Sequence, residues 1–313
     1  MPRLLAISGG VGGAKLALGL ASILGPDELT FAVNTGDDFE HLGLYIAPDV
    51  DTLTYTLAEV SNTDTGWGRG DESWAFMSAL EQLHGDTWFK LGDRDLALHV
   101  TRTRMLAAGA TLTEATAHIC GALGVAHRVL PMSNDPVRTT VHTDDGPLAF
   151  QHYFVRDRCK PKVTGFEFEG IANAILNPEI QDCLNNIDGI VICPSNPFVS
   201  IDPLLHIPEA RDALLEARVP IVAVSPIVGG TAIKGPTAKM MQELNVPASA
   251  DQVARHYGNL LTGLVLDEQD RALHGTLDTP TIVAQTVMVT LQDRVDLGHT
   301  VLEFIDSFNS FER

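Results

Sequence analysis

The chain has 313 residues, of which 45% are hydrophobic, and a formal net charge of -19 at pH 7. This length and apolar content allow a full core, and we expect a single α/β domain spanning residues 1–313. The negative charge and the absence of a Lys/Arg run argue against nucleic-acid binding. No apolar run reaches the roughly 18 residues that span a bilayer, and the N-terminus does not resemble a signal peptide, so we expect a cytoplasmic protein with no membrane partner. The four scattered cysteines form no C-x-x-C pair, which predicts reduced thiols.

The first part of the chain alternates strand-like and helix-like segments. Leu4–Ser8 and Leu29–Val33 predict strands, and helices are expected from Ala14 to near Leu24 and from Pro48 to about Val60. Such alternation predicts a parallel sheet.

The middle of the chain is predicted to be helical and to form a cap over one side of a cleft, at about 62–125. The expected helices cover about Ser73–Leu83, Asp95–Ala108 and Leu112–Leu123, and Thr111 with Glu114 forms a capping box before the last of them.

A β-hairpin insert is expected at about 136–160. Alternating apolar and polar residues run from Val137 to Val155 around Asp144-Asp145-Gly146-Pro147, which is a strong turn signal.

The alternation then resumes, with strands predicted at Gly189–Cys193 and Pro220–Val224. Helices are expected near Pro203–Ala217 and from Pro236 to about Leu244. The predicted fold is a doubly wound, mostly parallel, Rossmann-like sheet with the helical cap and the hairpin insert.

A glycine-rich turn after the first predicted strand is the most informative motif. Glycines bring backbone N–H groups close to an anion, and the N-terminus of the following helix attracts negative charge. The segment matches neither standard phosphate fingerprint, and a turn that only eases strand-to-helix packing is the alternative. The candidate phosphate contacts are Gly9, Gly10, Val11, Gly12, Gly13 and Lys15.

Carboxylates follow the second predicted strand and begin the next helix. Asp37 and Asp38 lie where a metal ion could be held, although an Asp-rich turn capping a helix explains them equally well. Asp49 and Asp51 are two residues apart on the helix, so only one of them can readily face the cleft, and helix capping alone would explain Asp49.

Residues 88–95 combine aromatic, cationic and acidic side chains around Gly92, a mixture that could bind a planar ring and an anion. A surface turn with a buried Trp and an ion pair is the alternative. Two later loops, 194–197 and 225–236, leave predicted strands at their carboxyl ends and could hydrogen-bond a nucleotide. No G-x-S-x-G elbow or metal-binding His spacing occurs, so the predicted chemistry is positioning and charge neutralisation at phosphorus.

Taken together, these motifs closely resemble the 2-phospho-L-lactate transferase family. The resemblance rests on residues 8–15, 34–38, 48–52 and 88–95, and the segments 130–133, 195–197 and 229–236 agree with it. It covers nearly the whole chain.

The resemblance implies a step in the biosynthesis of the deazaflavin coenzyme F420. A phosphorylated three-carbon acid would pass from a guanosine diphosphate conjugate to the ribityl hydroxyl of 7,8-didemethyl-8-hydroxy-5-deazariboflavin, releasing GMP. Phospholactate, phosphoenolpyruvate and phosphoglycerate all remain open as the acid. The family also implies Mg²⁺ dependence and a homodimer.

The same resemblance assigns roles to individual residues. Asp51 is the candidate catalytic residue, and Asp37 and Asp51 are the candidate Mg²⁺ ligands. The candidate deazaflavin contacts are Asp51, Lys90, Trp88, Asp93 and Arg94. The candidate nucleotide contacts, besides the glycine turn, are Ser133, Asn134, Ser195, Asn196, Pro197, Gly229 and Gly230.

The chain departs from the family pattern at Asn134, where an acid is expected. A non-catalytic regulatory protein that binds a nucleotide sugar is the competing hypothesis, because the gluconeogenesis-factor family is similar in its glycine turn and Asp-Asp loop. The segment 88–95, with Asp51, favours the transferase.

Overall fold

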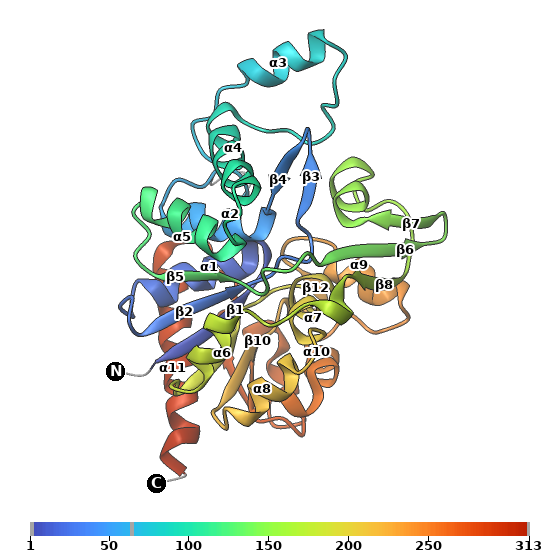
Figure 1. The fold of residues 1–313 in the computed structure, drawn as a ribbon. Coiled ribbons are helices and arrows are strands. Elements are labelled where there is room, and N and C mark those ends of the chain that lie inside the picture. Colours follow the sequence, from blue (N-terminus) through green and yellow to red (C-terminus); the bar gives the residue numbers. More distant parts are fainter. Residues whose placement is uncertain (1–2, 63–65, 312–313) are drawn as a thin grey trace.

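A seven-stranded, wholly parallel sheet forms the centre of the molecule in a computed structural model that describes residues 3–62 and 66–311 (Figure 1). Its strand order is β14-β13-β10-β9-β1-β2-β5. The strands are β1 (Leu4–Ser8), β2 (Leu29–Val33), β5 (Arg128–Pro131), β9 (Gly189–Ile192), β10 (Ile221–Val224), β13 (Gly263–Asp267) and β14 (Thr281–Ala284).

The sheet reverses its winding direction between β1 and β9. From β1 the chain adds β2 and β5 on one side, and it then returns to add β9, β10, β13 and β14 on the other side. Connections that leave two neighbouring strands in opposite directions open a crevice at their carboxyl ends, where ligands bind in folds of this kind. The glycine turn follows β1, and Pro194–Asn196 follow β9, so both lie at this crevice.

Helices cover both faces of the sheet, which is why its strands are apolar along their whole length. Leu4 and Ala6 face α1 (Gly10–Ala21), α2 (Pro48–Leu57) and α11 (Leu291–Phe311). Leu5 and Ile7 belong to the core on the opposite face. The helices of that face are α6 (Pro178–Leu184), α7 (Asp202–Leu205), α8 (Ala210–Glu216), α9 (Thr237–Glu243) and α10 (Ala250–Tyr257).

The structure confirms the predicted α/β class and its parallel strands, with differences at helix boundaries. The first helix begins at Gly10, so that three of the glycines lie in its first turn. The helix expected near Pro203–Ala217 is two helices, because Pro208 lacks an N–H and Glu209 has a positive φ of 64°. The strands β13 and β14 and the long C-terminal helix α11 were not predicted.

The helical region expected at 62–125 contains α3 (Ala75–Gln82), α4 (Asp93–Ala107) and α5 (Leu112–Ala122), whose capping box between Thr111 and Glu114 is present. Residues 63–65 of this range lie outside the described residues. In Figure 1, α3 stands above the rest of the molecule, next to the hairpin of β3 (Phe39–His41) and β4 (Leu44–Ile46).

The expected hairpin is present, but the insert is larger than predicted. β6 (Arg138–Thr143) pairs with β7 (Gly146–Ala149), and β8 (Val163–Glu169) pairs with the other edge of β6. Between β7 and β8 the chain forms a π-helix, η1 (His152–Arg156), where the second half of the hairpin was expected. The side chain of Tyr153 is buried in the core, and the strand ends there because of this packing. The remaining short elements are η2 (Ile171–Asn173), η3 (Pro197–Ile201), β11 (Ile227–Val228), β12 (Thr231–Ala232), η4 (Gly258–Leu260) and η5 (Glu268–Leu273).

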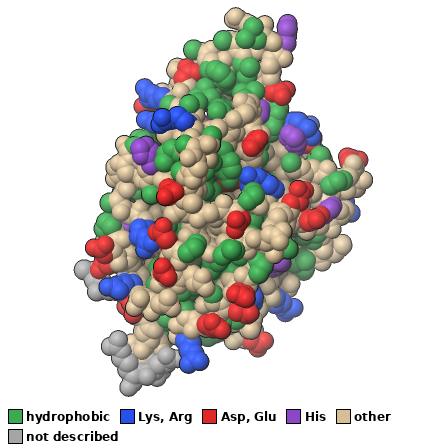
Figure 2. Space-filling model, viewed as in Figure 1, with side chains coloured by type: hydrophobic (Ala, Val, Ile, Leu, Met, Phe, Trp, Pro, Cys, Tyr) green, Lys and Arg blue, Asp and Glu red, His purple; other side chains and the backbone are tan. Residues whose placement is uncertain are grey.

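Two further expectations concern the surface and the thiols. Within the described residues, no helix combines the length and the apolar character needed to cross a membrane. Acidic side chains are spread over the face shown in Figure 2, with basic ones between them. All four cysteines are free thiols, as predicted from their spacing.

Gly19 sets how closely α1 packs against α11, and this packing can be tested. A Cβ at this position would lie 2.1 Å from the carbonyl oxygen of Arg294 in α11. Because that oxygen is backbone, Gly19→Ala must separate the helices, and we expect a loss of about 1 to 3 kcal/mol in the free energy of unfolding. Urea denaturation measures it.

Gly121→Ala in α5 is the matched control, because a Cβ there meets nothing within 4 Å. We expect it to raise the free energy of unfolding by about 0.5 to 1 kcal/mol through helix propensity. Equal effects of the two substitutions would contradict the packing explanation.

Candidate active site

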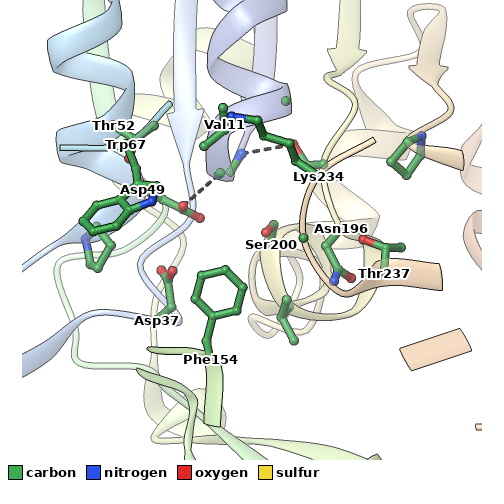
Figure 3. Close-up of a pocket in the computed structure, with 18 of the residues that line it drawn as sticks. Val11, Asp37, Asp49, Thr52, Trp67, Phe154, Asn196, Ser200, Lys234 and Thr237 are labelled. Carbon is green, nitrogen blue, oxygen red and sulfur yellow. Dashed lines mark hydrogen bonds between the residues drawn. The ribbon is translucent and has the colours of Figure 1, made fainter. Parts of the chain in front are cut away.

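A cavity of about 590 Å³ lies at the carboxyl ends of the sheet strands (Figure 3). Its walls come from the loops after β1, β2, β9, β10 and β14, from α2 and α4 of the adjoining helices, and from the insert. The cavity therefore forms at the predicted crevice and is closed by the cap region and the insert.

The glycine turn lies against the loop after β9 at one wall of the cavity. A Cβ at Gly12 would lie 2.4 Å from the carbonyl oxygen of Pro194, and one at Gly13 would lie 2.6 Å from Oγ of Ser195. The amide of Gly9 donates to the same Oγ over 3.2 Å. Glycine is needed here because the two backbones approach too closely for a side chain. Gly9, Gly10, Val11, Gly12 and Lys15 line the cavity, whereas Gly13 lies behind it.

Asp49 faces the cavity and binds the first turn of α1. Its Oδ1 accepts a hydrogen bond of 2.7 Å from the amide of Gly10, and its Oδ2 accepts one of 3.0 Å from Nδ2 of Asn34. Burial raises the pKa of this carboxyl to about 6. Helix capping alone would have explained Asp49 from the sequence. The expectation that only one of Asp49 and Asp51 faces the cavity is wrong, because both residues line it.

Asn34 also holds Asp37 beside Asp49. The same Nδ2 atom lies 3.1 Å from Oδ1 of Asp37, so the two carboxylates share one amide group. Burial, followed by the charge of Asp49, raises the pKa of Asp37 well above its usual range. Asp37 lines the cavity as expected, but Asp49 rather than Asp51 is the carboxylate that Asn34 brings next to it.

Asp51 lies in the cavity wall and pairs with a buried arginine of α4. Both of its oxygens contact the guanidinium of Arg102, which is only 1% exposed. His99 lies nearby, with Nδ1 3.7 Å from Asp51 and Nε2 3.2 Å from Oδ1 of Asp95. The hydroxyl of Tyr55 donates to Oδ1 of Asp95. Sequence reasoning missed this network, because only packing of α4 against α2 brings the side chains together.

Some residues of the segment 88–95 line the cavity, and others make contacts within the cap region or with the insert. Lys90 lines the cavity, while the ring of Trp88 contacts His41 and His152 instead. Asp93 accepts hydrogen bonds from Ser73 and from the amides of Ala75 and Phe76, so it fastens the start of α3 to the start of α4. The Ser73 hydroxyl, with those amides, holds the pKa of Asp93 below its usual value. Arg94 is exposed and does not line the cavity.

Of the predicted nucleotide contacts, Ser195 and Asn196 line the cavity. Pro197 begins η3 directly behind them. Gly229 and Gly230 form the turn between β11 and β12 with positive φ values of 55° and 80°. They lie outside the lining, although Val228 before them and residues 233–237 after them belong to it.

Ser133 and Asn134 lie away from the cavity. Oδ1 of Asn134 accepts hydrogen bonds from the amide and hydroxyl of Thr113, at 2.9 and 2.8 Å, and thereby adds to the cap of α5. Ser133 donates to the carbonyl of Ile175. The departure from the family pattern at Asn134 therefore falls where the side chain stabilises a helix end.

Basic groups gather at the side of the glycine turn. Nζ of Lys15 donates to the carbonyl of Met288 over 2.8 Å. Burial, followed by the charges of Arg294 and Lys234, lowers the pKa of Lys15. Lys234 also lines the cavity, so cations and buried carboxylates meet in one space. Sequence reasoning placed Lys234 in a candidate loop but did not single it out.

Within the described residues, no group of three or more His, Cys, Asp or Glu side chains is arranged to hold a metal ion. Mg²⁺ often uses only one or two protein carboxylates together with substrate phosphates, and Asp37 and Asp49 supply that number.

The buried carboxyl of Asp38 allows a test of how its ionisation affects the stability of the fold. Tyr45 donates to its Oδ2, and its Oδ1 has no hydrogen-bond partner among the residues that the structure describes. Burial raises the pKa of Asp38 to about 8. Between about pH 4 and pH 8 the Asp38 carboxyl ionises in the unfolded chain but stays protonated in the fold, so the free energy of unfolding falls as the pH rises. Above about pH 8 this loss of stability is complete. Since asparagine cannot ionise, we expect Asp38→Asn to raise the thermal midpoint relative to the original protein more at about pH 9 than at about pH 5. A larger benefit at the lower pH would show that the fold uses the charged form.

Comparisons with known proteins agree with this architecture. Residues 4–298 match the family described as 2-phospho-L-lactate transferase CofD. A phosphoenolpyruvate transferase of Kitasatospora aureofaciens is 37% identical over 298 residues, covering 93% of each chain. A 2-phospho-L-lactate transferase of Methanosarcina mazei is 34% identical over 303 residues, covering 96% of this chain and 99% of the relative.

Among solved structures, a UPF0052-family protein from Bacillus halodurans superposes with a TM-score of 0.63 at 15% identity. The match covers 96% of this chain and 100% of that one, and it bears on the fold alone. The family match and the relatives, which span nearly the whole chain, decide the membership. This protein belongs to the 2-phospho-L-lactate transferase CofD family.

Proposed function

We propose that this protein transfers a phosphorylated three-carbon acid from a guanosine diphosphate conjugate to the ribityl hydroxyl of 7,8-didemethyl-8-hydroxy-5-deazariboflavin and releases GMP. The acid is 2-phospho-L-lactate or a close analogue such as phosphoenolpyruvate or phosphoglycerate, and the step belongs to coenzyme F420 biosynthesis. The observation that carries the proposal is that the glycine turn, Asp51 and Lys90 all line the same cavity. The names of the relatives support the same transfer.

The nucleotide is assigned to the side of the glycine turn. The N-terminus of α1 attracts phosphate, and Lys15 and Lys234 add positive charge. Asn196 lies on the same side of the cavity as Lys234 in Figure 3, where its amide can hydrogen-bond the nucleotide. These residues orient the donor so that the phosphorus attached to the acid faces the acceptor.

The acceptor is assigned to the side of Asp51 and Lys90. The ribityl oxygen forms the new bond to phosphorus, and the bond from that phosphorus to the bridging oxygen breaks, so that GMP leaves. Asp51 accepts the hydrogen bond of the hydroxyl and assists removal of its proton, which ends on a phosphate oxygen of the leaving GMP. Because both carboxylate oxygens contact Arg102, a proton retained on Asp51 would leave a buried guanidinium unbalanced, so Asp51 is better suited to orient the hydroxyl than to keep the proton.

Asp37 and Asp49 fit the requirements of a Mg²⁺ ion. Both carboxylates are buried at the cavity and share Nδ2 of Asn34, and burial raises both pKa values. A divalent cation would compensate their charge, and phosphate oxygens would complete its ligands. When bound, Mg²⁺ would offset the charge of the bridging phosphates. Asp51 was the partner expected for Asp37, and its contact with Arg102 makes Asp49 the stronger candidate.

A turnover assay tests the proposed function. Purified protein is mixed with the deazaflavin, Mg²⁺ and each guanosine diphosphate conjugate separately, and GMP and the phosphodiester are followed by mass spectrometry. We expect stoichiometric GMP and phosphodiester from one conjugate, which identifies the acid. Tight binding of a nucleotide sugar without product from any conjugate would instead support a regulatory protein.

The metal assignment is tested by comparing Asp37→Asn, Asp49→Asn and Asp51→Asn. We expect the first two to raise the Mg²⁺ concentration for half-maximal activity by about tenfold, the size found when a metal site is weakened through its ligands or their supports. Asp51→Asn should lower turnover with little change in that concentration, because it acts on the hydroxyl. If Asp51→Asn raised the required Mg²⁺ concentration and Asp49→Asn did not, Asp51 rather than Asp49 would be the metal ligand.

A further inference from the structure

The insert places an aromatic ring in the cavity that neither the motifs nor the proposed chemistry uses. Phe154 is 38% exposed and lines the cavity, and in Figure 3 its ring points into the space between Asp37 and Asn196. The ring of Phe150 stacks on it with centroids 5.5 Å apart and planes 9° apart. Stacking holds one face of the Phe154 ring and leaves the opposite face for another flat group.

The backbone that carries Phe154 is fixed on several sides. It lies in the π-helix η1, a rare form that is frequent at functional sites. On one side of it, Tyr153 is fully buried in the core. On the other side, Val155 packs against the apolar cluster that contains Phe89. The side-chain amide of Gln151, just before the helix, donates to the carbonyl of Asp37 over 3.2 Å.

Contacts of η1 assign Phe154 to the acceptor side of the cavity. The ring of His152 lies 4.8 Å from that of Trp88, in an edge-to-face arrangement. Trp88 and Phe89 directly precede Lys90, which lines the cavity. The insert is therefore attached to the same segment that brings Lys90 to the acceptor.

We propose that Phe154 is the stacking platform for the planar ring system of the deazaflavin, and that Trp88 positions it through His152. This inference rests on the proposed function, because it names the surface that receives the acceptor. A wide, flat heteroaromatic ring is the ligand that an exposed phenyl ring with one stacked face fits best.

Binding of each substrate alone provides the test. The deazaflavin and GDP are titrated separately into the original protein and into Phe154→Ala, Phe154→Leu and Phe154→Tyr. We expect the Kd for deazaflavin to rise about tenfold in the Ala and Leu variants, since stacking on an aromatic side chain is worth that order, and to recover in the Tyr variant. The Kd for GDP should not change, and circular dichroism verifies folding.

Phe76→Ala is the matched control, because Phe76 is 39% exposed on α3 and lies outside the cavity lining. It should leave both Kd values unchanged. Trp88→Ala should weaken deazaflavin binding less than Phe154→Ala does, because Trp88 lies outside the cavity lining and reaches the platform through its contact with His152.

The outcomes separate the inference from the function on which it rests. If the original protein binds deazaflavin and Phe154→Ala binds it equally well, the platform is wrong while the transferase stands. If Phe154→Ala weakens GDP binding instead, the ring seats the nucleobase and the inference is overturned. If the original protein binds GDP but no deazaflavin, the proposed function fails and the platform fails with it.

Discussion

The close approach of two backbones at the reversal point of the sheet is the constraint on which the site depends. The first turn of α1 lies so near the loop after β9 that a Cβ at Gly12 would lie 2.4 Å from the carbonyl oxygen of Pro194. The amides at the start of α1 therefore face the same space as Ser195 and Asn196. A side chain at this point would push apart the strands' exit loops, and the phosphate-attracting end of the helix would no longer line the cavity.

The carboxylates that line this space differ in how their charge is compensated. Asn34 holds Asp37 and Asp49 together through one amide group, and burial raises the pKa values of both. Asp51 is treated differently, because the guanidinium of Arg102 already neutralises it. The pair of Asp37 and Asp49 thus has a different environment from Asp51, and the proposed division between metal binding and hydroxyl orientation follows from that difference.

The loops that follow the sheet strands supply the side of the cavity proposed to bind the nucleotide, while the cap region and the insert supply the other side. Both attachments are anchored through aromatic contacts: Trp88 meets His152, and Phe89 belongs to the cluster on which Val155 packs. The cap and the insert consequently support each other across the cavity. Asp93 has a structural part in this arrangement, because it fastens α3 to α4 instead of lining the cavity.

The sequence by itself determined the features that depend on local rules. Apolar runs separated by helical segments predicted the parallel sheet, and β1 and β2 begin and end at the predicted residues. The glycine turn, Ser195 and Asn196 were found from their positions after predicted strands, because carboxyl ends of parallel strands meet at one edge. Lys90 and Asp51 were found through the family resemblance, and both line the cavity.

Only the tertiary structure decided which side chains meet across the cavity. Spacing along α2 left Asp49 and Asp51 equivalent, and the partners came from Gly10 and Asn34 on one side and from Arg102 of α4 on the other. No local sequence signal predicts the π-helix that carries Phe154, because the position of Tyr153 is set by its packing in the core. Contacts between residues far apart in sequence depend on how elements pack, and periodicity and turn chemistry carry no information about that packing.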